Sequence, residues 1–148
     1  MPPIRLKPTQ AGFDYFEAVS ALQKFCRRGM VDEAIYMATE LSISGYYEAV
    51  WKRLQIIAIE DVGTGNPNLI VELRALYDAS KVIGKKDDPF HLGVIEATLR
   101  VCESPKTRRA DNIYGLYIEH RHRLPPFVIP DWTKGMFTRE GKKRGRGN

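Results

Sequence analysis

The sequence predicts an all-α protein, in which about six helices pack as a compact bundle of hairpin-like pairs. Apolar residues recur at helical spacing in successive segments of the chain. None of these segments alternates between apolar and polar residues over a useful length, as a half-buried strand would. The connections between the segments are short, so consecutive helices should pack against each other.

The first two helices are expected to follow an extended lead-in. Residues 1–12 contain three prolines and a glycine, which predicts an extended segment. The first helix is expected over residues 13–28 and ends at Gly29, because glycine suits the left-handed conformation found at helix C-termini. Asp32 is the expected N-cap of a second helix over residues 33–42.

Three longer helices are expected in the middle of the chain. The third covers residues 46–62, and its wide apolar stripe predicts a central position in the bundle. The fourth covers residues 68–84. The fifth covers residues 89–104, with Asp88 as its cap and Pro89 at its first position, where the missing N–H of proline costs nothing.

The C-terminal part of the chain changes character. A sixth helix is expected over residues 106–123, and it completes a helical domain over residues 13–124. Residues 125–133 contain three prolines and are predicted to be extended on the surface. Residues 134–148 are rich in glycine and basic residues and are predicted to be a flexible, disordered tail.

The net charge of +5 comes from this tail. Its basic residues outnumber its one acid, Glu140, whereas residues 1–133 carry 17 basic and 17 acidic side chains. Such a tail has the composition of a nucleic-acid arm, whose charge displaces counterions from phosphates without reading sequence. A solubilising terminus or a docking tag for an acidic protein is the alternative interpretation. The candidate nucleic-acid-binding residues of the tail are Lys134, Arg139, Lys142, Lys143, Arg144 and Arg146.

Further candidates lie near the tail and in the body. Lys106, Arg108 and Arg109 open the sixth predicted helix and either extend a basic surface or pair with nearby acids. Trp132 and Phe137 flank the start of the tail, where Trp132 either stacks on bases or packs the proline segment onto the helical body.

The stretch IAIEDVGTGNP, residues 57–67, allows three interpretations. A phosphate-binding loop is disfavoured because the glycine spacing is wrong and the required lysine is missing. A carboxylate site built from Glu60 and Asp61, with His91 as a partner, would require an enzyme pocket that gathers these side chains. The favoured interpretation is structural: Gly63 ends the helix, and Asp61 is a buried or half-buried carboxylate that bonds to the neighbouring backbone.

No metal or cofactor is expected. The histidines and cysteines are not spaced as zinc ligands, and the two cysteines, Cys26 and Cys102, are predicted to be buried thiols in a reducing compartment. The sequence has no apolar run of about 18 residues and its N-terminus lacks the apolar core of a signal peptide. We therefore expect no membrane contact and a cytoplasmic location, associated with the nucleoid if the source is a bacterium or a phage.

The run from residue 31 to residue 70 resembles the C-terminal helical region of the MgsA/RarA family of replication-associated recombination proteins. These are AAA+ ATPases whose eukaryotic relatives interact with the Werner helicase. The resemblance covers about residues 20–120 and is carried by the E-D-V-G-x-x-N-P run. The matching positions include Asp32, Ala34, Tyr36, Gly45, Arg53, Leu54, Glu60, Asp61, Val62, Gly63, Asn66 and Pro67. Pro105, Lys106 and Tyr114 match a later segment.

The sequence departs from the family pattern in informative ways. Lys52 and Ile59 replace an arginine and a serine of the pattern, and these 148 residues contain no Walker motif. The resemblance therefore implies the oligomerisation collar, related to that of clamp loaders, and not the ATPase module. It implies that Arg53, Glu60, Asp61, Gly63, Asn66 and Pro67 are structural residues of a helix junction.

These observations predict a non-enzymatic helical module that acts in DNA replication, recombination or repair. It is expected to form a homo-oligomer, to bind nucleic acid, DNA in particular, and to dock onto an AAA+ ATPase or another replication protein. The alternative is a protein-interaction adaptor that binds no nucleic acid.

Overall fold

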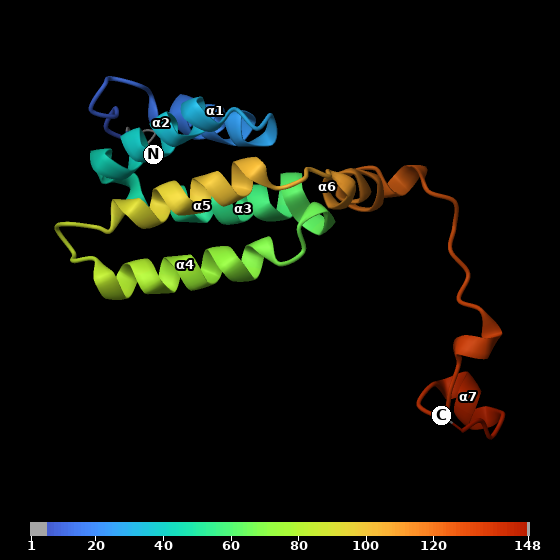
Figure 1. The fold of residues 1–148 in the computed structure, drawn as a ribbon. Helices are drawn as coiled ribbons and strands as arrows, with labels where there is room; N and C mark the ends of the chain where they lie inside the picture. The colour runs from blue at the N-terminus through green and yellow to red at the C-terminus, as the bar shows by residue number, and fades with distance from the viewer. Residues whose placement is uncertain (1–5, 148) are drawn as a thin grey trace. The chain divides into compact units, whose positions relative to one another are not determined.

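The computed structural model describes residues 6–147 (Figure 1). The described residues form helices and no β-strand, which confirms the predicted all-α fold class. The α-helices are α1 (Tyr15–Arg27), α2 (Val31–Leu41), α3 (Tyr47–Ile57), α4 (Leu69–Ile83), α5 (His91–Glu103), α6 (Arg109–Tyr114) and α7 (Arg139–Lys143). Wider π turns follow α2, α3 and α6, as η1 (Ser42–Tyr46), η2 (Ala58–Val62) and η4 (Gly115–Glu119). Short 3₁₀ turns are η3 (Gly63–Gly65), η5 (Arg121–Arg123) and η6 (Asp131–Thr133).

The chain forms two compact units, of which the first ends at Tyr114 and the second begins at Gly115. The predicted helical domain extends further, to Leu124. The sixth predicted helix is interrupted in the structure, because α6 passes into a π turn at Gly115 and into a 3₁₀ turn at Arg121. Glycine is a weak helix former, which favours a change of geometry at Gly115.

The first unit is layered (Figure 1). α1 and α2 lie on one side of the pair α3 and α5, and α4 lies on the other side. α3 is central, as its apolar stripe predicts, and Val50, Trp51, Leu54 and Ile57 on this helix are fully buried. Each helix contributes one apolar face to the core, whose largest other members are Leu22, Leu41, Leu69, Leu73, Val94 and Val101.

Two predicted helix caps are wrong by a few residues. α2 begins at Val31 after Met30, so Asp32 lies in the first turn instead of at the cap. α5 begins at His91 after Phe90, and Asp88 instead forms a backbone-paired turn with Lys85. Both errors come from reading a polar residue as a cap, whereas neither observed cap makes a side-chain hydrogen bond. Acidic Asp32 still faces the positive end of the helix dipole.

The second unit contains more structure than a disordered tail. Residues 125–130 have no regular secondary structure, as their prolines predict, but Asp131–Thr133, which were also predicted to be extended, form the 3₁₀ turn η6. Helix α7 then occupies part of the region predicted to be disordered, and Thr138 caps it by accepting a hydrogen bond from the Gly141 N–H. Local capping explains this helix, since a threonine at the N-cap satisfies an otherwise unpaired amide.

Candidate functional site

Asp61 is the centre of a buried junction between α1, η2 and the segment that leads into α6. Its side chain has no exposed surface. It accepts hydrogen bonds from Arg27 Nε at 2.8 Å and Gln23 Nε2 at 3.1 Å, and Arg108 Nε lies 3.3 Å away. The structure confirms that Asp61 is a buried carboxylate, but the prediction that it bonds to neighbouring backbone is wrong, because the hydrogen-bond donors are the side chains of Arg27 and Gln23. Two guanidinium groups compensate for the desolvation of one carboxylate, which would otherwise be costly to bury.

The neighbouring Glu60 occupies a more open position than Asp61. Its side chain is 33% exposed and lies 3.9 Å from Arg27 Nη2 and 3.8 Å from Arg108 Nη2. His91 lines a different cavity, where its Nδ1 lies 2.7 Å from Ser42 Oγ. The two carboxylates and His91 are therefore not gathered into one pocket. Within residues 6–147, no group of three or more His, Cys, Asp or Glu side chains is placed to hold a metal ion.

The glycines after Asp61 allow the chain to fold back on itself. Gly63 has φ 50° and ψ −128°, a backbone conformation that residues with a Cβ rarely adopt. A Cβ on Gly65 would lie 2.3 Å from the carbonyl oxygen of Pro105. This close approach lets the Thr107 N–H donate to the Asp61 carbonyl at 2.9 Å. The predicted structural role of Gly63 therefore has a direct geometric basis.

The remaining residues of the E-D-V-G-x-x-N-P run and Arg53 support the same junction. Asn66 Nδ2 donates to Ser104 Oγ at 3.0 Å, and Asn68 is the N-cap of α4. Pro67 lies in the turn between them. Arg53 Nη1 donates to Gln23 Oε1 at 3.0 Å and so orients the amide that binds Asp61. Sequence reasoning missed Gln23, since a glutamine within a helix carries no local signal of a distant partner.

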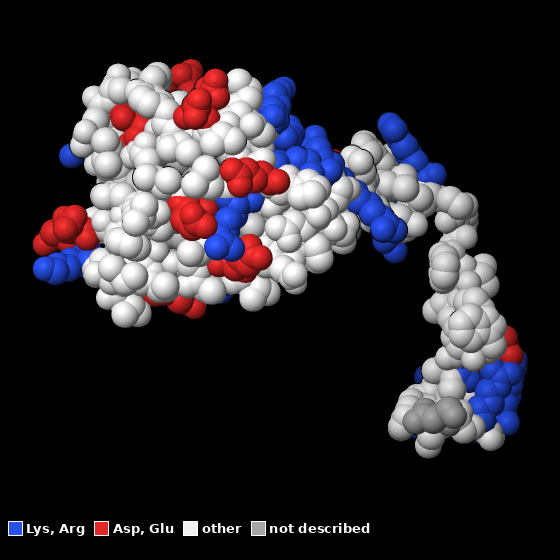
Figure 2. All heavy atoms as spheres, in the orientation of Figure 1, with Lys and Arg blue, Asp and Glu red and all other residues white. Residues whose placement is uncertain are grey.

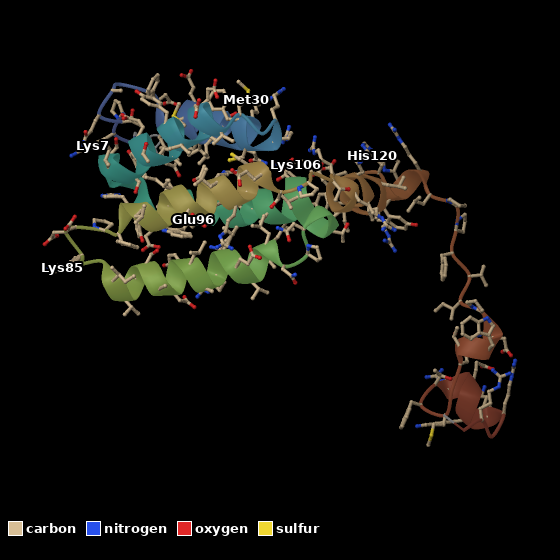
Figure 3. All side chains as sticks on the ribbon, viewed as in Figure 1. Lys7, Met30, Lys85, Glu96, Lys106 and His120 are labelled. Atoms are coloured by element: carbon tan, nitrogen blue, oxygen red, sulfur yellow. The ribbon has the colours of Figure 1, made fainter. Side chains whose placement is uncertain are left out.

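Three basic residues of the body were candidates for nucleic-acid binding, and two of them bind groups of the body itself. Lys106 lies where α5 passes into α6 (Figure 3) and donates to the carbonyls of Cys102 at 2.8 Å and Ser104 at 2.7 Å. Burial lowers the pKa of Lys106 from its ordinary value. Arg108 binds Asp61 and also Asp111, at 2.6 Å. Arg109 is exposed and makes no ion pair with another described residue, which leaves it available to a ligand.

The two cysteines lie together beside Lys106. Both are free thiols and both are buried, as the sequence predicts. The hydrogen bond to Cys102, together with burial, raises the pKa of the Cys26 thiol far above its usual range. The same hydrogen bond lowers the pKa of Cys102. The pair links α1 to α5 next to the Asp61 junction.

The candidate residues of the tail differ in their partners. Arg144 and Arg146 both form ion pairs with Asp131, and Arg146 holds the pKa of that carboxyl below its usual value. Lys143 lies 4.0 Å from Glu140. The other three candidates make no ion pair within the described chain, and they are Lys134, Arg139 and Lys142. The tail thus carries basic side chains that have no internal partner.

Several aromatic and aliphatic side chains near the tail are exposed. Trp132 is 82% exposed and Phe137 is 76% exposed. Four apolar or aromatic residues around the start of the second unit lie outside the core. They are 46% to 59% exposed, which excludes the core, and they are Ile113, Tyr114, Tyr117 and Ile118.

The net charge divides sharply between the two units. Residues 1–114 contain 15 basic and 15 acidic side chains, whereas residues 115–148 contain 8 basic and 3 acidic ones. The second unit therefore carries the whole net charge of +5. Figure 2 shows Lys and Arg gathered on it, with acidic and basic side chains mixed on the first unit. No helix among the described residues is long and apolar enough to cross a membrane.

The sequence is similar to that of proteins with a name and a family. The replication-associated recombination protein A of Haemophilus influenzae is 26% identical over 144 residues, which cover 93% of this chain and 32% of the relative. The protein of the same name from Bacillus subtilis is 26% identical over 99 residues, which cover 67% of this chain and 23% of the relative. The matched part of this chain thus spans a third or less of the length of each of these curated relatives. Residues 29–148 match the family described as MgsA AAA+ ATPase C terminal, and the chain belongs to that family.

Proposed function

We propose that this chain is a non-enzymatic helical module that acts in DNA replication, recombination or repair and contacts nucleic acid through its second unit. The observation that carries the proposal is the charge division, because the whole net charge of +5 lies in residues 115–148. The family and the names of the relatives supply the replication and recombination context. Concentrated positive charge is the electrostatic footprint of phosphate binding.

The chemistry of the second unit supports contact with a nucleic-acid backbone. Lys134, Arg139 and Lys142 have no carboxylate partner among residues 6–147, so no ion pair within that range has to break when they meet phosphate. Exposed Trp132 and Phe137 offer flat apolar surfaces on which unpaired bases stack. These features favour a single strand or a strand junction and carry no base-specific readout.

The first unit supports self-association, which is the second part of the proposal. Its charge is balanced, so copies do not repel each other electrostatically. Val71 and Val82 are 68% and 85% exposed on α4, and they lie on one face because eleven residues make about three helical turns. We propose that this face contributes to a homo-oligomer and that the oligomer docks onto an AAA+ ATPase, as the family implies.

Fluorescence anisotropy with single-stranded, duplex and forked DNA tests the nucleic-acid contact. The full chain is compared with a variant that carries Lys134→Gln, Arg139→Gln, Lys142→Gln and Lys143→Gln, at several salt concentrations. The control variant removes the same number of basic side chains from the first unit, through Lys24→Gln, Lys52→Gln, Arg74→Gln and Arg100→Gln. We expect the tail variant to lose most of its salt dependence, by about 0.7–0.9 in logarithmic slope for each phosphate contact removed.

The outcomes separate the candidate functions. Loss of the salt dependence in the tail variant, with the control unchanged, supports the phosphate-binding tail. If neither the wild-type chain nor the control binds any DNA at low salt, the nucleic-acid proposal fails. The chain is then an oligomerising adaptor whose basic tail serves an acidic protein partner.

A further inference from the structure

The first unit contains a second candidate site, separate from the Asp61 junction. An open cavity of about 900 Å³ lies beside η1, the start of α3, the end of α4 and the α4–α5 loop. Lys85, near the start of this loop, lines the cavity (Figure 3). The cavity falls within the size range of small-molecule sites in proteins. None of the residues of the E-D-V-G-x-x-N-P run lines it.

A buried hydroxyl without a partner lies at this cavity. Tyr47 lines the cavity and is only 9% exposed, and its Oη has no hydrogen-bond partner among the described residues. A buried hydroxyl normally finds a partner, because leaving one unsatisfied destabilises the folded state. Tyr47 therefore places one unused, buried donor in the wall of the cavity.

A second polar group is oriented at the same wall. Ser42 Oγ and His91 Nδ1 lie 2.7 Å apart, and the rings of His91 and Tyr47 meet edge to face with centroids 6.2 Å apart. Ser42 is buried, and its contact with Nδ1 fixes the position of the imidazole ring at the wall of the cavity. In the tautomer that accepts from the Ser42 hydroxyl at Nδ1, the ring carries its proton on Nε2 and offers a second donor.

The charges around the cavity favour an anion. Glu48 is already bound by Lys81 at 2.7 Å and by the Tyr77 hydroxyl at 2.6 Å, and the hydrogen bond from Lys81 lowers its pKa. Lys85 and Lys86 also line the cavity and pair with no acid among residues 6–147. Asp87 is the remaining acidic lining residue. The charged lining groups that have no ion-pair partner among residues 6–147 are therefore two ammonium groups and the Asp87 carboxylate, which leaves a net charge of +1.

We propose that this cavity binds the phosphate monoester of a nucleotide-sized ligand. Several donors facing one space match the three oxygens of a phosphate monoester, and charge-assisted hydrogen bonds to such oxygens are strong. The ligand is either a free mononucleotide or the 5′-phosphorylated end of a strand, since both present the same group. The site does not depend on the basic tail, so it stands or falls separately from the DNA contact proposed above.

Calorimetric titration of the full chain tests the site with inorganic phosphate, deoxythymidine monophosphate and deoxythymidine as probes. Tyr47→Phe removes the unpaired hydroxyl without emptying the space. The double variant Lys85→Gln with Lys86→Gln removes the rim charges, and Lys24→Gln with Lys52→Gln is the matched control. We expect each cavity variant to bind the monophosphate at least about tenfold more weakly, as loss of a charged or buried hydrogen bond implies, and the control to bind normally.

Stability measurements separate binding from folding. Tyr47→Phe should melt at the same temperature as the wild type or higher, because it removes an unsatisfied buried hydroxyl. Matched oligonucleotides with a 5′-phosphate or a 5′-hydroxyl distinguish the two sources, since a strand-end site discriminates between them and a mononucleotide site does not. The four-charge tail variant should keep its affinity for the monophosphate.

The proposal is overturned by either of two results. The first is the absence of any heat of binding when the monophosphate is titrated up to about 10 mM, which is the weak end of specific binding. The cavity would then hold only water. Equal affinity of the wild type, Tyr47→Phe and the lysine double variant would place any binding elsewhere on the chain. Equal affinity for deoxythymidine and its monophosphate would also exclude phosphate as the recognised group.

Discussion

Asp61 carries its charge at a site with no solvent exposure, between Arg27 and Arg108. The stability of such a group depends on its partners more than on its own chemistry. Each guanidinium reaches solvent, with exposed fractions of 28% and 41%, so the attraction is partly screened. Without the carboxylate charge, the guanidinium groups of Arg27 and Arg108 would nevertheless lie close together and repel each other, next to the buried amide of Gln23.

We therefore expect Asp61→Asn to lower the free energy of unfolding by about 2–4 kcal/mol, somewhat below the full cost of breaking a buried ion pair. Denaturation by urea, followed by circular dichroism, measures this change. Glu60→Gln is the control, because its partners are 3.8–3.9 Å away and its side chain is 33% exposed. Its expected effect is below about 1 kcal/mol. Equal losses in the two variants would contradict a special role for Asp61.

At the scale of helices, the crossing of α4 and α5 depends on small residues. A Cβ on Gly93 would lie 2.0 Å from Ser80 Oγ, 3.1 Å from Ser80 Cβ and 3.4 Å from Trp51 Cζ2. Gly93 and Ser80 therefore let the two helices approach closely above the ring of Trp51. This contact also positions His91, which stands two residues earlier at the start of α5.

Gly93→Ala should destabilise the protein by about 1–3 kcal/mol, as overpacking of a core does. Ser80→Ala removes the atom in closest conflict and should cost less. We expect the double variant to be more stable than the sum of the single losses predicts, because the second change relieves the clash made by the first. Thermal melts of the four proteins give the coupling energy. Strict additivity would show that the clash is relieved elsewhere.

At the scale of the whole chain, stability and charge belong to different units. The buried apolar residues of the described core lie between Ala18 and Cys102, all within the first unit. The net positive charge lies in the second unit. Folding free energy comes mainly from burial of apolar surface, whereas long-range attraction for an anionic polymer comes from net charge.

A chain that ends at Tyr114 should therefore keep its helical circular dichroism signal and melt within a few degrees of the full chain. Its binding to DNA should be weak and nearly independent of salt, because its charges balance. Thermal melts and anisotropy on the same samples check both expectations. A large fall in melting temperature would show that the second unit stabilises the first.

Much of this fold could be predicted because its signals are local. Helical spacing of apolar residues located α1 to α5 to within a few residues, and Gly29 and Gly63, with φ of 65° and 50°, end helical segments as expected. The mismatch of Asp61 with the helix dipole indicated a buried role. The helix caps and the short helix α7 were harder to predict from the sequence, because the identity of a single polar residue decides where a helix begins.

The sequence by itself determined the helices, their order, the neutral body and the basic C-terminal unit. Each of these follows from neighbours in the chain or from simple summation of charge. Only the tertiary structure decided which residues bind Asp61 and that the free thiols of Cys26 and Cys102 lie together. It also decided that Tyr47, Lys85 and His91 line one cavity. Those contacts join residues far apart in sequence, and they are set by how helices cross, which depends on the packing of the whole core.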